Sequence, residues 1–91
     1  MAPQARANPE DLRKFAAHLK QFNNAVRDNL AILQAEFRDL GTSWQDQEYI
    51  RFAQEFDQTT RVLTQFIRFS DEQIPFILRK AERIDDYLNQ R

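Results

Sequence analysis

The fold is decided by residues 40–46, which read Leu40-Gly41-Thr42-Ser43-Trp44-Gln45-Asp46. Gly41 is the only glycine in 91 residues, and the chain has only three prolines. Because each turn of a sheet or multi-loop fold draws on glycine or proline, this composition predicts about one turn. Apolar stripes with helical spacing lie on both sides of it, so the sequence predicts an all-α antiparallel helical hairpin.

The stretch before the turn is predicted to form one helix over residues 9–40. Asn8 can cap its N-terminus, Pro9 suits the first helical position, and two carboxylates follow where the helix dipole favours them. Residues 1–7 are then expected to be a flexible tail. At the other end Gly41 is expected to close the helix with a positive φ.

The stretch after the turn is predicted to form a helix over residues 44–89, with the turn at 41–43. Ser43 and Asp46 resemble a capping box at its start. Pro75 lacks a backbone donor, so a kink or break is expected near 70–75, where Ser70 could recap the helix. Residues 44–73 already match the first helix in length, so the segment 74–88 is expected to pack against a partner subunit.

The apolar stripes are wider than the single seam between two helices requires. Eight phenylalanines add to the excess, because each buries on the order of 150 Å² or more when covered. A hairpin of this kind is expected to pair with a second copy, or with a paralogous hairpin, into a four-helix bundle. The residues expected to form the core and the dimer contact are Leu12, Phe15, Leu19, Phe22, Val26, Leu33, Phe37, Phe52, Phe56, Leu63, Phe66, Ile77 and Ile84.

Composition argues against several classes of partner. The chain carries 13 Lys and Arg against 14 Asp and Glu, a formal net charge of −1, which gives no electrostatic reason to bind nucleic acid. The N-terminus lacks the pattern of a signal peptide, and no stretch approaches the roughly 18 apolar residues of a membrane span. We therefore expect a cytoplasmic protein with no stable membrane insertion, or one exported without a classical signal peptide.

The sequence offers no set of residues suited to catalysis. His18 is the only histidine and there is no cysteine, so a metal site of the usual kind is not expected. Asp85 and Asp86 are adjacent and point to different faces of a helix, which is unsuitable for an acid and base pair. One glycine cannot make a glycine-rich phosphate loop. We expect no enzyme activity and no cofactor.

A helical hairpin of this length with Trp44 at the turn resembles the WXG family of small, ESAT-like proteins exported by type VII (ESX-type) secretion systems. The likeness covers nearly the whole chain in helix length, turn position and Phe and Leu spacing. The family pattern is Trp-x-Gly, whereas the third residue here is Asp46, whose side chain could cap the second helix. The family also carries a Tyr-x-x-x-Asp/Glu tail, whereas Tyr87 is followed four positions later by Arg91.

Trp44 and Tyr87 each have a structural and a functional interpretation. The ring of Trp44 could cover the end of the hairpin. By resemblance, Gly41, Trp44 and Asp46 would form a recognition turn, completed by the partner subunit's C-terminal tail and read by a secretion ATPase. Tyr87 is either the remnant of the tail signal or a residue at the edge of the apolar stripe.

Three functions remain in competition at this point. The first is a non-enzymatic type VII secretion substrate, or a structural partner that escorts a larger cargo protein. The second is an intracellular helical adaptor or oligomerisation module that is never exported. A membrane-active effector is the third, and a mean hydropathy of −0.73 argues against it.

Overall fold

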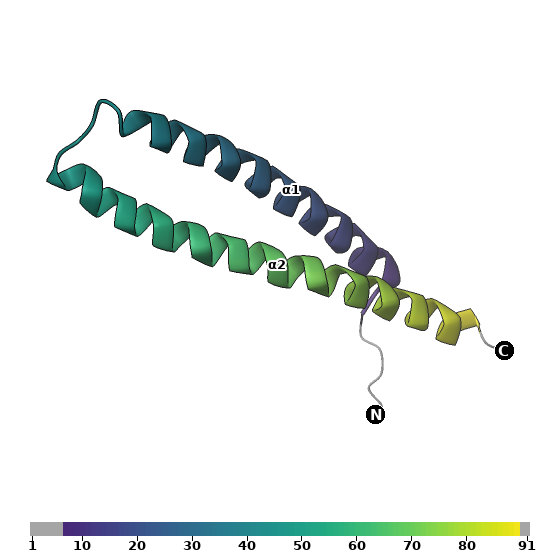
Figure 1. Ribbon diagram of the computed structural model, residues 1–91. Helices are drawn as coiled ribbons and strands as arrows, with labels where there is room; N and C mark the ends of the chain where they lie inside the picture. Colours follow the sequence, from purple (N-terminus) through teal and green to yellow (C-terminus); the bar gives the residue numbers. More distant parts are fainter. Residues whose placement is uncertain (1–6, 90–91) are drawn as a thin grey trace.

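The computed structural model describes residues 7–89, which form two helices and no strand. Helix α1 spans Pro9–Leu40 and helix α2 spans Gln47–Asn89. They run antiparallel as one hairpin measuring 69 × 24 × 15 Å, with the turn at one end and the C-terminus at the other (Figure 1). The predicted all-α hairpin is confirmed. Residues 1–6 of the expected tail lie outside the described residues.

Helix α1 begins as its sequence predicts. Asn8 has extended backbone angles, φ −97° and ψ 123°, and its Oδ1 accepts hydrogen bonds from the amides of Glu10 at 2.8 Å and Asp11 at 3.3 Å. Pro9 follows in the first turn, where a missing N–H leaves no helical carbonyl unpaired. An amide-accepting cap of this kind stabilises a helix by about 1 kcal/mol.

Helix α2 begins three residues later than predicted. Asp46 is its N-cap, because Oδ1 accepts from the amides of Glu48 at 3.0 Å and Tyr49 at 3.1 Å. The expected start at residue 44, with Ser43 as the cap, is wrong. The Ser43 hydroxyl and the Trp44 amide instead donate to the carbonyl of Leu40, at 3.3 and 2.9 Å, so residues 41–46 all belong to the turn.

Of the kink or break expected near Pro75, the break is absent, since α2 is helical from Gln47 to Asn89 (Figure 1), and the kink stays a prediction. Ser70 does not recap a second segment. Its hydroxyl donates to the carbonyl of Phe66 at 2.7 Å, within the same helix. Pro75 itself is exposed, and buried residues precede and follow it on the side that faces α1, at Ser70 and Ala81. Packing on both sides outweighs the one hydrogen bond that proline removes.

The segment 74–88 is helical, but it does not leave its own α1 for a partner. Ala81 and Ile84 are buried within the single hairpin, and Asp85 forms an ion pair with Arg13. The expectation assumed that the helices pair symmetrically about the turn, whereas α2 is displaced along α1. Asn23 of α1 faces Ser70 of α2. Because the helices are antiparallel, Pro9, fourteen residues before Asn23, lies level with Ile84, fourteen residues after Ser70. The last described residues, 86–89, are all exposed.

The buried part of the seam between the helices consists of two alanines, two isoleucines, an asparagine and a serine. The residues buried there are Ala16, Asn23, Ile67, Ser70, Ala81 and Ile84. Of the stripe predicted to form the core, Ile84 alone is buried in the single chain. The half-buried members are Leu12, Leu19, Val26, Phe37, Phe56 and Ile77. The exposed members are Phe15, Phe22, Leu33, Phe52, Leu63 and Phe66.

Candidate functional site: the aromatic turn and the exposed face

Gly41 does not have the backbone conformation that its position predicts. Its φ is −62° and its ψ −15°, which is right-handed helical, and no residue from 7 to 89 has a positive φ. Its amide donates to the carbonyls of Phe37 and Arg38, at 3.3 and 3.2 Å. The expected left-handed closure is therefore wrong, and another constraint must account for the glycine.

Space for the Tyr49 ring accounts for the absence of a side chain at residue 41. A Cβ on Gly41 would lie 2.6 Å from Oη and 3.1 Å from Cζ of Tyr49, and 3.3 Å from the carbonyl oxygen of Arg38. The tyrosine cannot easily give way, because its ring stacks on Phe37 at 4.8 Å between centroids and its hydroxyl donates to the Phe37 carbonyl at 3.4 Å. Gly41 thus lets the two helices close over an aromatic residue.

Five aromatic rings pack at the closed end of the hairpin and form the turn cluster, which consists of Phe37, Trp44, Tyr49, Phe52 and Phe56. Trp44 lies half-buried, edge-on to Tyr49 at 5.3 Å and 6.3 Å from Phe52. Phe37 contacts Phe52 and Phe56, at 5.5 and 4.9 Å. Trp44 therefore covers the end of the hairpin, as one of its two interpretations predicts. The predicted turn residues Gly41, Trp44 and Asp46 lie together here.

A row of large exposed side chains extends from the turn cluster along one side of the hairpin. It has a helical repeat on both helices, since Phe15 and Phe22 are seven residues apart and so are Phe69 and Phe76. Phe22 and Phe66 connect the two helices edge to face, at 6.4 Å between ring centroids. We call this surface the aromatic face; its exposed members are Phe15, Phe22, Leu33, Leu40, Phe52, Val62, Leu63, Phe66, Phe69 and Phe76.

The aromatic face contains a shallow groove next to the turn cluster. The groove has a volume of about 370 Å³ and is lined almost entirely by apolar side chains, Leu33, Glu36, Phe37, Leu40, Phe52 and Phe56. Phe22 is 54% exposed and Phe66 47%, although both rings are large and apolar. Contiguous apolar surface of this extent marks an interaction site in a folded protein.

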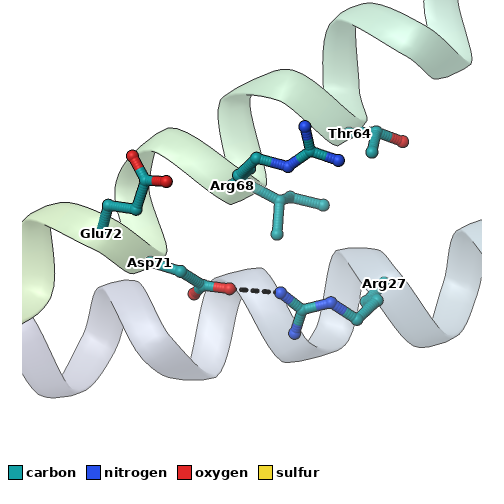
Figure 2. Close-up of a pocket in the computed structure, with 6 residues that line it drawn as sticks. Arg27, Thr64, Arg68, Asp71 and Glu72 are labelled. Atoms are coloured by element: carbon teal, nitrogen blue, oxygen red, sulfur yellow. Dashed lines mark hydrogen bonds and ion pairs between the residues drawn. The ribbon is translucent and has the colours of Figure 1, made fainter.

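The opposite side of the seam is charged, and we call it the polar flank. Arg13 pairs with Asp85, and Arg27 pairs with Asp71. The two pairs are spaced by fourteen residues on each helix, so both recur in the same place after two heptads. Figure 2 shows Arg27 and Asp71 pointing toward one another from α1 and α2. All four side chains are more than a third exposed, so each pair alone adds little stability.

A buried polar contact joins the polar flank to the middle of the seam. Asn23 is 0% exposed and Ser70 is 3% exposed. The Asn23 amide donates to Ser70 Oγ and to Asp71 Oδ1, both at 3.0 Å. The hydrogen bond from Asn23 is the main cause that lowers the pKa of Asp71 below its ordinary value, and Arg27 lowers that pKa further. These residues were missed from the sequence, although a polar residue seven positions after Ala16 was a signal of a special contact.

Tyr87 lies far from the turn. It is 73% exposed near the C-terminal end of α2, which is the end of the hairpin opposite the turn (Figure 1). Arg91, which stands where the family tail has a carboxylate, lies outside the described residues. Within one chain, Trp44 and Tyr87 cannot contribute to a common surface.

No grouping for metal ligation was found among residues 7–89, and His18 is exposed on α1. No helix within that range is long and apolar enough to cross a membrane.

The geometry defines a class of protein: an elongated two-helix hairpin with an aromatic turn and one exposed apolar side. The chain belongs to the WXG100 family, described as proteins of 100 residues with WXG, whose model matches residues 4–87. The predicted resemblance is confirmed. No curated protein was found to match.

Two crystal structures have the same fold. Both are of the secreted protein EsxB from Bacillus anthracis strain Sterne. The selenomethionine-labelled form is 19% identical with a TM-score of 0.74 and covers 97% of this chain and 100% of that one. A point mutant is 18% identical with a TM-score of 0.71 and covers both chains completely.

The contact between residue 41 and Tyr49 can be tested by a double-mutant cycle. Gly41→Ala should lower the free energy of unfolding by about 1–3 kcal/mol, because it overpacks the turn. Tyr49→Phe removes the atom that lies 2.6 Å from the added Cβ, so the double variant should lose less than the sum of the two single changes. Urea denaturation of the four proteins measures this. Strict additivity would mean that Tyr49 is not the reason for the glycine.

The hydrogen bonds to Asp71 predict a pH dependence of stability. Its folded pKa is lowered, so the carboxylate stabilises the fold above its unfolded pKa of about 4, and this stabilisation is lost as the pH falls through the folded value. Asp71→Asn should therefore destabilise the protein at pH 7, and its difference in stability from wild type should shrink as the pH falls below about 4. Thermal denaturation across this range is the measurement, and Asp28→Asn, an exposed change on α1, is the control. A difference from wild type that does not depend on pH would contradict this role.

Proposed function

We propose that this WXG100 chain is a non-enzymatic protein associated with type VII secretion, as a substrate or as a structural partner of one. It acts by pairing its aromatic face with a second hairpin. The preferred partner is a second copy of the chain, and a paralogous hairpin is the alternative. The observation that carries the proposal is the aromatic face, since one hairpin leaves Phe15, Phe22, Phe66, Phe69 and Phe76 about half exposed.

The energetics favour pairing through this surface. Fully covering a large apolar side chain gains about 1.5–3 kcal/mol, and the aromatic face offers ten such side chains. Pairing must offset several kcal/mol of lost translational and rotational freedom, which a surface of this extent can supply. The polar flank suits solvent, because Arg13 and Arg27 are already paired within the chain.

The arrangement of charges supports a non-enzymatic role. Asp71 and Asp85 form ion pairs with arginines, which leaves neither carboxylate poised as a free acid or base. The groove next to the turn cluster has one charged residue, Glu36, among apolar ones. Such a surface recognises another apolar surface.

Pairing would also bring the two predicted recognition elements together. Trp44 and Tyr87 lie at opposite ends of one hairpin, so a composite surface requires the turn of one subunit beside the C-terminal end of the other. A two-fold axis across the middle of the aromatic face produces this arrangement at both ends. A secretion ATPase or a larger cargo protein would then read two equivalent surfaces.

An intracellular adaptor that is never exported is the alternative function. It is favoured by the tail, where Arg91 replaces the acidic residue of the family pattern. The two functions share the same pairing surface and differ only in export.

Pairing can be tested by sedimentation equilibrium at micromolar concentration. The 10.9 kDa chain should sediment as a dimer, and Phe22→Asp with Phe66→Asp should make it a folded monomer. Ile50→Asp is the matched control, because Ile50 is also 54% exposed but lies three heptads before Asp71, on the side of the polar flank. A monomeric wild type would exclude the homodimer. Failure to pair with hairpins encoded beside it as well would exclude the proposed function.

Export can be tested in the host cell by measuring the chain in the culture medium with and without a functional type VII ATPase. Export that depends on the ATPase and falls with Trp44→Ala supports the secretion role. Ile50→Ala, which removes exposed apolar surface outside the aromatic face, is the control. Retention of the wild type inside cells with an active system would favour the adaptor.

A further inference from the structure

The seam and the aromatic face are related by a single-residue step along both helices. Phe15 and Phe22 immediately precede Ala16 and Asn23, which are buried. In α2 each of three phenylalanines likewise precedes a seam residue, in the pairs Phe66 with Ile67, Phe69 with Ser70, and Phe76 with Ile77. A step of one residue is a rotation of about 100° around a helix axis. Rolling both helices by that angle would therefore exchange the buried row for the phenylalanine row.

Apolar burial alone does not fix the rotation of the helices in a single hairpin. The rolled arrangement would cover rings that are now about half exposed and release Asn23 and Ser70 to water, but it would also expose Ile67 and Ile84, which are now buried. The observed hairpin has the opposite arrangement, with an amide and a hydroxyl inside and the rings outside. Interactions other than apolar burial must therefore select the observed arrangement.

The polar contacts across the seam are suited to that task. We call Asn23, Arg27, Ser70 and Asp71 the polar lock. Asn23 donates to Ser70 Oγ and Asp71 Oδ1, both at 3.0 Å, and Arg27 reaches Asp71 from the polar flank (Figure 2). All buried side-chain polar atoms in residues 7–89 have a partner. Rolling the helices outward on this side would separate every one of these groups from its partner on the other helix.

We infer that the polar lock is a positioning device that fixes the rotation of α1 and α2 and holds the aromatic face outward. The inference rests on the proposed function only in that this face is the one that pairs. Phe22 and Phe66 flank the lock directly, at positions next to Asn23 and four before Ser70, so their cross-helix contact depends on the same rotation. The lock thereby keeps the rings on a surface that a second chain can cover.

The first test replaces the buried pair with apolar groups, as N23L/S70A. Because both partners are removed together, the melting temperature should stay the same or rise. The dimer dissociation constant should rise at least tenfold, because the rings turn into the seam. The exchanged pair N23S/S70N keeps an amide opposite a hydroxyl and should retain most of the wild-type affinity. An N23L/S70A variant that is folded and pairs like wild type would overturn the inference.

The second test reports the rotation within one chain, whether or not it pairs. Lys20 lies seven residues from both Arg13 and Arg27, and Leu78 lies seven from both Asp71 and Asp85, so these two positions face each other between the ion pairs. The chain has no cysteine, so Lys20→Cys with Leu78→Cys introduces the only thiols. A short bismaleimide should join them within the chain in the wild-type background. The yield should fall several-fold in N23L/S70A and recover in N23S/S70N.

The outcomes separate this inference from the proposed function. If the wild type does not pair, but its intrachain cross-link depends on Asn23 and Ser70, the proposed pairing is excluded and the polar lock is supported. If the wild type forms a dimer and N23L/S70A changes neither the cross-link yield nor the affinity, the polar lock is excluded and the pairing is supported. Circular dichroism of each variant establishes that it is helical. If N23L/S70A does not fold, R27Q/D71N is tested in its place, since it removes the ion pair on the exposed side of the lock. It should lower the cross-link yield and the affinity in the same way. If neither falls, the inference is overturned.

Discussion

Two helices share one seam, and that seam is too narrow to cover eight phenylalanine rings. The rest of the structure depends on this limit. Small and polar residues such as Ala16, Asn23 and Ser70 lie in the seam, which allows the helices to approach closely. It leaves the large rings beside the seam, where one chain can cover only part of each. A chain of 91 residues has little other means of building a core, because its surface is large relative to its volume.

The limited space between the two helices also constrains the turn at the closed end of the hairpin. The helices can converge there only if the residue after Leu40 has no side chain, because the Tyr49 ring occupies the space. Asp46, where the family pattern has glycine, supplies the cap of α2 through its carboxylate. A glycine at that position would offer no side-chain acceptor to the amides of Glu48 and Tyr49. The departure from Trp-x-Gly is therefore compatible with the same turn, with the carboxylate stabilising the first turn of α2.

The sequence predicts the secondary structure better than it predicts the packing. Helical periodicity and the Asn8-Pro9 start were sufficient for α1, because they depend on neighbours three or four residues apart. The rule that a lone glycine closes a helix with positive φ failed at Gly41, since the decisive contact comes from Tyr49, eight residues away. The rule that proline breaks a helix failed at Pro75, because α1 supports α2 on both sides.

Periodicity also could not predict which residues of the wide apolar stripe lie in the seam and which lie on the aromatic face. A residue that faces its own helix and one that faces a partner both need to be apolar, so Phe22 and Leu19 look alike in the sequence. The discriminating residues are the polar ones within the stripe, Asn23 and Ser70, because a buried amide requires a partner at a defined position. Gly41 and Trp44 were sufficient to predict where the turn lies. The contacts of Tyr49 with the turn and of Asp71 with α1 depend on how the two helices pack, which periodicity does not predict.

Holding the rings outward links folding to association. A rotation of about 100° would exchange one apolar row for another, so the rotation of the helices decides which row stabilises the single hairpin. The rings that are left exposed stabilise only the paired state, in which a second hairpin covers them. Stability of the pair then depends on concentration and on the identity of the partner. The hydrogen bonds of Asn23 thus contribute less to the strength of the fold than to deciding which surface the fold presents.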